Sequence, residues 1–154
     1  MIKKLLYVFG ISILPVIELR GAIPAGAAMG LPFWAVFLCA ILGNLLPVPF
    51  ILIFIEKILL FMKEHNIFPK LVHWLEEKAQ KGAARVENYA LLGLSLFVAI
   101  PLPGTGAWTG ALVAALFHME KRRAMLSITL GVLIAGIIMT LASYGVVGFL
   151  KIFL

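Results

Sequence analysis

Residues 18–26 read Glu18-Leu19-Arg20-Gly21-Ala22-Ile23-Pro24-Ala25-Gly26, and they place a carboxylate and a guanidinium inside a run of otherwise apolar residues. Two prolines, Pro15 and Pro24, bracket the charged pair. An ionisable side chain is costly inside a membrane, so its presence there points to a functional site. Proline and glycine interrupt helices, which a bilayer tolerates only where protein or water satisfies the freed backbone groups. The stretch therefore predicts a broken helix within a membrane, with charge at the break.

The composition predicts an all-α integral membrane protein. Of the 154 residues, 63% are hydrophobic and 13% are charged, whereas a soluble domain carries about 25% charged residues. The length suits a single domain over residues 1–154. The formal net charge of +6 indicates cytoplasmic loops and contact with anionic membrane lipids. Nucleic-acid binding is not expected, because exposed aromatic residues do not alternate with the basic ones.

The first half of the chain contains a short apolar run and then a long one. Residues 5–17 form the short run, which cannot cross a bilayer because a transmembrane helix needs about 20 residues. Residues 33–55 are uncharged and long enough to cross, with predicted interruptions at Gly43-Asn44 and at Pro47-Val48-Pro49. We expect Asn44 to donate an interhelical hydrogen bond, with contact to a substrate as the alternative.

The second half contains a similar succession. A polar interval over residues 57–88 includes an expected amphipathic helix from Phe68 to Val86, lying on the membrane surface or against the bundle. A short apolar run over residues 89–100 leads to a second break, Pro101-Leu102-Pro103-Gly104-Thr105-Gly106-Ala107-Trp108-Thr109-Gly110. A second long apolar span follows over residues 124–150.

The two halves resemble each other in the order of their elements and in several matched residues. The matched pairs are Gly10 with Gly93, Ile17 with Ile100, Gly21 with Gly104 and, after one inserted residue, Gly26 with Gly110. The charges are not repeated, since Pro101 stands where Glu18 stands and Pro103 where Arg20 stands. We therefore assign repeat one to residues 5–56, a cytoplasmic amphipathic linker to 57–88 and repeat two to 89–151.

The repeat allows two topologies. If each broken segment enters the membrane and returns to the same side, each half crosses once, and the halves form an inverted structural repeat of a re-entrant hairpin plus a transmembrane helix. If the broken segments cross fully, the chain has four spans and no inversion. The lysine and arginine residues are divided between the two sides of the membrane in the same numbers under both topologies, so they do not choose between them. The short apolar runs and the charge cluster at 120–123 favour the re-entrant arrangement.

The two break motifs resemble those of the putative small multidrug export protein family over nearly the whole chain. The residues that carry the resemblance are Glu18-Leu19-Arg20-Gly21-Ala22-Ile23-Pro24 and the second break over residues 101–110. The resemblance implies a multi-pass protein of the cytoplasmic (inner) membrane of a prokaryote. It also implies distant similarity to the DedA superfamily, which has paired re-entrant hairpins and is implicated in moving lipids. DedA-like proteins carry arginines in the second motif, and this chain has none there.

The leading functional hypothesis is a small secondary transporter or exporter of an unknown substrate, with proton or cation coupling through Glu18 and Arg20 as charge partner or anion clamp. The alternatives are a lipid or polyprenyl-phosphate flippase or scramblase of DedA type and a non-transporting assembly protein. In a non-transporting protein, Glu18 and Arg20 would form a buried ion pair that only stabilises the fold. The candidate substrate or ion site comprises Glu18, Arg20, Gly21, Pro24, Asn44, Pro101, Pro103, Gly104, Thr105, Gly106, Trp108 and Thr109.

Spacing provides the argument that the two charges share one cavity. Residues two apart share a face only in an extended segment, so we expect an unwound stretch around Gly21 and Pro24. Amides, hydroxyls and a helix N-terminus at the second break would then complement the charges. We expect no enzyme activity, catalytic residue, cofactor or metal site, since Asp is absent and Cys39 and the three histidines are scattered. We expect a homodimer, because one chain encloses little volume.

Overall fold

A computed structural model of the protein describes residues 1–65, 90–102 and 104–153, together with positions 67, 69, 70, 73 and 77. Over these ranges the chain is helical and contains no strand. The helices are α1 (Ile2–Ile13), α2 (Glu18–Ala28), α3 (Phe33–Leu45), α4 (Val48–Glu64), α6 (Ala90–Ala99), α7 (Ala107–Leu116) and α8 (Lys121–Phe153). The all-α prediction is therefore confirmed. The amphipathic helix predicted from Phe68 to Val86 lies outside the described residues.

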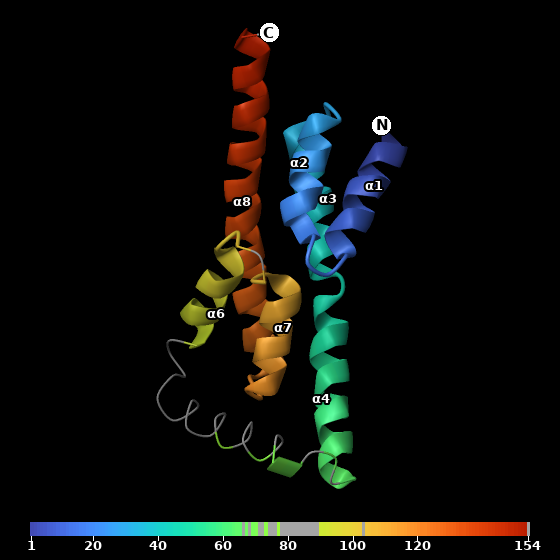
Figure 1. Cartoon of the computed structure of the whole chain (residues 1–154), viewed down its shortest axis with the longest axis vertical. Helices are drawn as coiled ribbons and strands as arrows, with labels where there is room; N and C mark the ends of the chain where they lie inside the picture. The colour runs from blue at the N-terminus through green and yellow to red at the C-terminus, as the bar shows by residue number, and fades with distance from the viewer. Residues whose placement is uncertain are drawn as a thin grey trace.

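The first half begins with a pair of short helices, α1 and α2, that lie side by side (Figure 1). The turn between them spans residues 14–17, and its backbone is strained: Val16 has φ 75° and Glu18 has φ 52°. Such angles are uncommon outside glycine and cost about 1–3 kcal/mol each. The helix break therefore falls directly before Glu18.

The prediction that residues around Gly21 and Pro24 are unwound is wrong, because both lie inside α2. Pro24 removes one backbone donor, and the helix continues through it because its neighbours are well packed. Ile23 is fully buried and Ala27 is nearly so, and α2 contacts α1, α3 and α8. Burial of this helix on three sides outweighs the loss of one hydrogen bond.

The long apolar stretch of the first half is divided into α3 and α4 at Leu46 and Pro47. Pro47 precedes α4 and Pro49 is its second residue, so two backbone donors are missing where the helix changes direction. The predicted interruption at the prolines is confirmed. The one predicted at Gly43-Asn44 is wrong, because α3 continues to Leu45.

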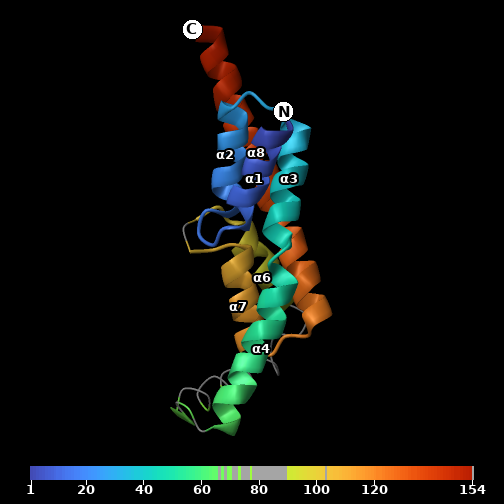
Figure 2. The ribbon, with the colours of Figure 1, turned by 90° about the vertical axis from the view of Figure 1, so that its right-hand side faces the viewer.

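The second half repeats the order short helix, turn, short helix and long helix. Helix α6 leads into a turn over residues 100–106, α7 leads away from it, and α8 runs most of the length of the molecule (Figures 1 and 2). In Figure 1 the N-terminus and the far end of α2 lie at one end of the molecule, whereas the far ends of α4 and α7 lie at the other. The 14–17 and 100–106 turns therefore approach each other near the middle.

Close helix packing within each half depends on glycine at comparable places. A Cβ added to Gly43 of α3 would lie 2.7 Å from the Phe9 carbonyl oxygen of α1, and one added to Gly131 of α8 would lie 2.6 Å from the Ser95 carbonyl oxygen of α6. Small residues let helix backbones approach in this way in membrane proteins. In each half, the first short helix is thus held directly against the long one.

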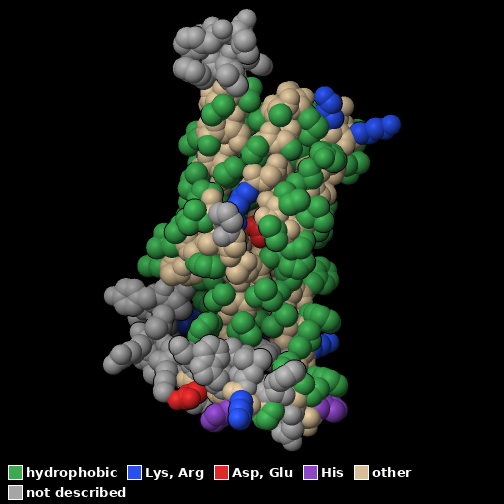
Figure 3. All heavy atoms as spheres, in the orientation of Figure 1, with side chains coloured by type: hydrophobic (Ala, Val, Ile, Leu, Met, Phe, Trp, Pro, Cys, Tyr) green, Lys and Arg blue, Asp and Glu red, His purple; other side chains and the backbone are tan. Residues whose placement is uncertain are grey.

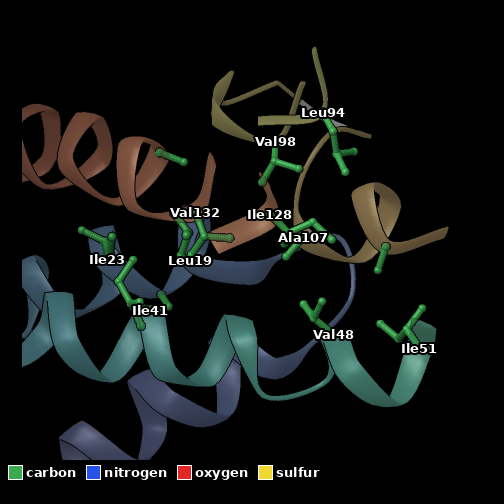
Figure 4. Packing of buried hydrophobic residues seen from close by; sticks show 14 of the residues in the cluster. Leu19, Ile23, Ile41, Val48, Ile51, Leu94, Val98, Ala107, Ile128 and Val132 are labelled. Atoms are coloured by element: carbon green, nitrogen blue, oxygen red, sulfur yellow. The ribbon is translucent and has the colours of Figure 1, made fainter. Parts of the chain in front are cut away.

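A single cluster of buried apolar side chains joins the two halves. Figure 4 shows members of this cluster from α2, α3, α4, α6, α7 and α8, with Leu19 and Ile23 contributed by α2 and Val132 by α8. Two stretches, Phe33–Glu64 and Lys121–Gly148, are long and apolar enough to cross a membrane. The short helices are not long enough to cross a membrane, as the sequence predicted for the apolar run before each break.

Candidate functional site at the meeting of the two helix breaks

The Glu18 carboxylate binds the N-terminal end of α7. Trp108 is the second residue of that helix and donates its backbone N–H to Glu18 Oε1 at 3.1 Å, and the backbone amide of Ala107 also faces the carboxylate. The first amides of a helix have no partner within the helix, and the helix dipole places partial positive charge there. Because Glu18 is only 2% exposed, this contact replaces the water that would otherwise solvate the carboxylate.

Glycine at position 106 makes this contact possible. Gly106 has φ 135°, a conformation that L side chains rarely adopt. A Cβ at this position would lie 2.7 Å from the Glu18 carboxyl carbon. Both the turn into α7 and the close approach of the carboxylate therefore require glycine here. This gives a physical role to one of the glycines that the sequence marked as a candidate.

The Arg20 guanidinium binds the C-terminal end of α6. Its Nη2 donates to the Ile100 carbonyl at 2.9 Å and to the Val98 carbonyl at 3.4 Å. The last carbonyls of a helix lack partners and carry partial negative charge, so a cation is favoured beside them. Arg20 and Glu18 thus serve the two helix ends of the same break, each with the complementary sign of charge.

Thr105 connects Arg20 to the turn between α6 and α7. The Thr105 hydroxyl donates to the Ile100 carbonyl at 2.7 Å and lies 3.0 Å from the Leu102 carbonyl. The same hydroxyl accepts from Arg20 Nη2 at 2.8 Å, and Arg20 Nη1 donates to the Thr105 carbonyl. The guanidinium is therefore fixed by a turn that the threonine side chain itself organises.

Trp108 also forms a link in the opposite direction. Its indole Nε1 donates to the Ile13 carbonyl at 3.0 Å, and Ile13 is the last residue of α1. Trp108 of the second break thus caps the C-terminal end of α1. In return, Glu18 and Arg20 of the first break cap the N-terminal end of α7 and the C-terminal end of α6. These contacts hold the two turns together across a sequence separation of 95 residues.

Asn44 completes the site from α3. Its side chain faces the Glu18 carboxylate, and the residue is fully buried. Among the described residues, neither its Nδ2 nor its Oδ1 has a partner in hydrogen-bond geometry, and the same is true of Arg20 Nε. Asn44 of α3 thus faces Glu18 of α2 outside good hydrogen-bond geometry, and the interhelical hydrogen bond expected for Asn44 stays a prediction. Unpartnered buried polar atoms are costly, so these three atoms call for an explanation.

The charged pair lies within hydrophobic surroundings. Arg20 Nη1 and Glu18 Oε2 are 3.8 Å apart, and their side chains are 13% and 3% exposed. Figure 3 shows a basic and an acidic group side by side, halfway along an otherwise apolar face. The arrangement can exchange a proton, hold an anion or fix the fold, and each of these uses the same contacts.

The other candidates lie at various distances from this centre. Gly104 has φ 85° in the second turn, and Pro101 is exposed there. Gly21 and Pro24 lie inside α2. Thr109, on α7, is not among the described residues that hydrogen-bond Glu18 or Arg20. Pro103 lies outside the described residues.

Sequence reasoning did not identify the carbonyl acceptors of Arg20. Val98 and Ile100 contribute only backbone oxygens to the site, so their side chains carry no signal. Pro101, directly after Ile100, does carry one, because a proline ends the preceding helix and leaves its last carbonyls free. An arginine in one half and a proline-terminated helix in the other could have been paired on that ground.

Comparison with known proteins agrees with the break motifs. Residues 18–138 match the family described as "Putative small multi-drug export protein". No curated protein and no solved structure matches the chain. The family description is that of an exporter rather than an enzyme, and with the two apolar helices it indicates a membrane protein. Since the match covers most of the 154 residues, from Glu18 through just over half of α8, the chain belongs to the small multidrug export family.

Proposed function

We propose that this chain is a small proton-coupled exporter of the cytoplasmic membrane, with Glu18 as the proton site and Arg20 as its charge partner. The observation that carries the proposal is the placement of Glu18. It is a nearly fully buried carboxylate held between the two helix breaks, in contact with Trp108, Asn44 and Arg20. A carboxylate kept from water between two structural halves is suited to binding a proton and releasing it when the halves move.

We propose further that both helix pairs are re-entrant and that the two halves form an inverted repeat. Helix α1 has 12 residues, α2 has 11, and α6 and α7 have 10 each. At a rise of 1.5 Å per residue they are about 15–18 Å long, whereas the hydrocarbon core is about 30 Å thick. Each pair thus reaches only the midplane, where its turn meets the other turn. Transporters built from inverted repeats hold their sites at such a level.

A lipid flippase of the distantly similar DedA type is a second candidate. The observation that favours it is the position of the Arg20 guanidinium, which is partly exposed on an apolar face and has one unpartnered nitrogen. Guanidinium groups recognise phosphate with two parallel hydrogen bonds. A lipid head group could therefore reach the site from the bilayer.

A structural role is the third candidate, because Glu18 and Arg20 satisfy helix ends that would otherwise lack partners. Reconstitution into liposomes separates the three. A transporter moves radiolabelled sulfate or the cationic dye ethidium when a proton gradient is imposed, and empty liposomes do not. A flippase exposes lumenal fluorescent phosphatidylglycerol to external dithionite without a gradient. Folded protein that does neither would contradict both transport functions and leave the structural role.

A further inference from the structure

We propose that the Glu18 carboxylate occupies, in this structure, the binding place of an anionic group of the substrate, and that protonation of Glu18 vacates it. The inference rests on the proposed proton site and names the substrate class for it: a carboxylate, or a phosphate or sulfate oxyanion. The substrate anion and the Glu18 carboxylate would then compete for one set of donors.

The donors around Glu18 form an anion site rather than a matched ion pair. The N-terminal amides of α7 and the Arg20 guanidinium both favour negative charge. Yet among the described residues the Trp108 amide is the one donor in good hydrogen-bond geometry with Glu18, at 3.1 Å, while the Ala107 amide and the Asn44 side chain face the carboxylate outside that geometry. Arg20 Nη1 remains 3.8 Å away, which is beyond hydrogen-bond distance.

Two further donors have no partner in hydrogen-bond geometry within the part of the chain that the structure describes. Arg20 Nε and Asn44 Nδ2 are buried without hydrogen bonds, and Asn44 is fully buried beside the carboxylate. Buried donors are nearly always satisfied. These donors lack an acceptor because the carboxylate of Glu18 is tethered to α2 and cannot reach them. A free anion in the same place could reach more of them.

The side-chain oxygen of Asn44 can accept a hydrogen bond from Glu18 once Glu18 is protonated. Protonated Glu18 carries an O–H donor, and Asn44 Oδ1 is a buried acceptor beside it with no partner. We infer that the protonated acid turns from the α7 N-terminus to this oxygen. One proton then enters for each monovalent anion, so the net charge of the buried site is the same before and after the exchange.

The charged group facing Glu18 is Arg20, from its own helix. Helices α3 and α7 contribute the uncharged Asn44 and the amides of Ala107 and Trp108. No described titratable group of α1 or α8 acts on the carboxylate. Proton uptake at Glu18 therefore leaves the cationic Arg20 without a counter-charge, and anion binding should strengthen as the pH falls.

The test is calorimetric titration of the purified full-length chain with sodium benzoate and with sodium sulfate, whose charges stay constant between about pH 5.5 and pH 7.5. Glu18→Gln removes the competing charge and keeps the side-chain shape. Glu56→Gln is the matched control, because Glu56 pairs with Lys121 at an exposed position. We expect Glu18→Gln to bind one of these anions at least about tenfold more tightly than the wild type at the higher pH, because the competing carboxylate is gone.

The pH series provides a second readout. Wild type and Glu56→Gln should tighten toward the lower pH with uptake of about one proton per anion, and Glu18→Gln should show neither effect. Equal or weaker binding by folded Glu18→Gln overturns the proposal. If Glu18→Gln fails to fold, the wild-type series decides, and affinity that does not rise as the pH falls overturns it.

Two arms separate the possible sources of the anion and the two proposals. In nanodiscs, phosphatidylglycerol should weaken benzoate binding relative to phosphatidylcholine if the natural ligand is a lipid head group, and should leave it unchanged if the ligand is soluble. Proton-driven transport by the wild type, with no gain of anion binding in Glu18→Gln, would overturn the competition and leave the proton site standing. Competition between the anion and Glu18 without proton-driven transport would leave the competition standing and overturn proton-coupled transport.

Discussion

Trp108 donates its backbone N–H to the Glu18 carboxylate at 3.1 Å across 90 positions of sequence. The contact places a negative charge of the first half at the positive end of a helix of the second half. Arg20 does the converse for the negative end of α6, at Ile100. The second break has no charged side chain, and both charges beside its helix ends come from the first break.

Replacement of Glu18 should distinguish capping of α7 from charge. Glu18→Gln keeps an oxygen that can accept from the Trp108 amide, so we expect its free energy of unfolding to stay within about 1 kcal/mol of the wild type. Glu18→Ala leaves that amide buried and unpaired and should cost about 1–3 kcal/mol. Thermal unfolding in detergent measures both. Equal destabilisation by the two variants would contradict the capping role.

Replacement of Gly106 should be severe, and replacement of a matched glycine should not. Gly106→Ala introduces a Cβ that meets the Glu18 carboxyl group at a φ of 135°, so we expect a loss of more than about 2 kcal/mol. Gly10 lies inside α1 with open space around it, and Gly10→Ala should be neutral or stabilise by about 0.5–1 kcal/mol. Similar unfolding temperatures for the two variants would show that the carboxylate does not approach the 106 backbone.

Asn44 offers the sharpest separation of folding from activity. Because its two amide atoms have no partner in hydrogen-bond geometry among the described residues, Asn44→Leu replaces an unsatisfied buried amide by an apolar side chain with the same number of heavy atoms. The variant should unfold at the wild-type temperature or above it. The same variant should lose proton-coupled transport, since it lacks the acceptor for protonated Glu18. An unstable Asn44→Leu protein would indicate a structural hydrogen bond. Full transport activity would remove Asn44 from the proposed mechanism.

The re-entrant topology can be tested by labelling single cysteines in a Cys39→Ser background. Lys3, Pro32 and Glu64 are all exposed and are suitable sites. The re-entrant arrangement predicts that a membrane-impermeant maleimide reaches residues 3 and 32 from one side of the membrane and residue 64 from the other. Labelling of residues 3 and 32 from opposite sides would contradict it and support four full spans.

The sequence predicts the helix breaks well, because proline and glycine act locally on the backbone. The Pro47-Val48-Pro49 stretch and the 100–106 turn both interrupt helices where these residues stand. Pro24 was misjudged because its effect depends on its neighbours. Ile23 is buried to 0% exposure, and that packing, which belongs to the tertiary structure, keeps α2 continuous.

The site was predictable in its members but not in its connections. Charge among apolar residues identified Glu18 and Arg20, and the second break identified Thr105 and Trp108. The partner of each charge depends on how two turns 78–95 residues apart meet, which no local pattern encodes. The side chain of Asn44 shows the same limit, because the sequence predicts an interhelical contact for it but not that the contact is with Glu18.

In the proposed mechanism, Glu18 takes up and releases the transported proton. The most direct test is proton flux into proteoliposomes containing a lumenal pH indicator, driven by an imposed gradient of sulfate or ethidium, for wild type, Glu18→Gln and Glu56→Gln. We expect flux for the wild type and for Glu56→Gln. For Glu18→Gln we expect an unchanged unfolding temperature and flux no greater than that of empty liposomes. Wild-type flux through folded Glu18→Gln would contradict this mechanism and leave Glu18 as a cap for α7.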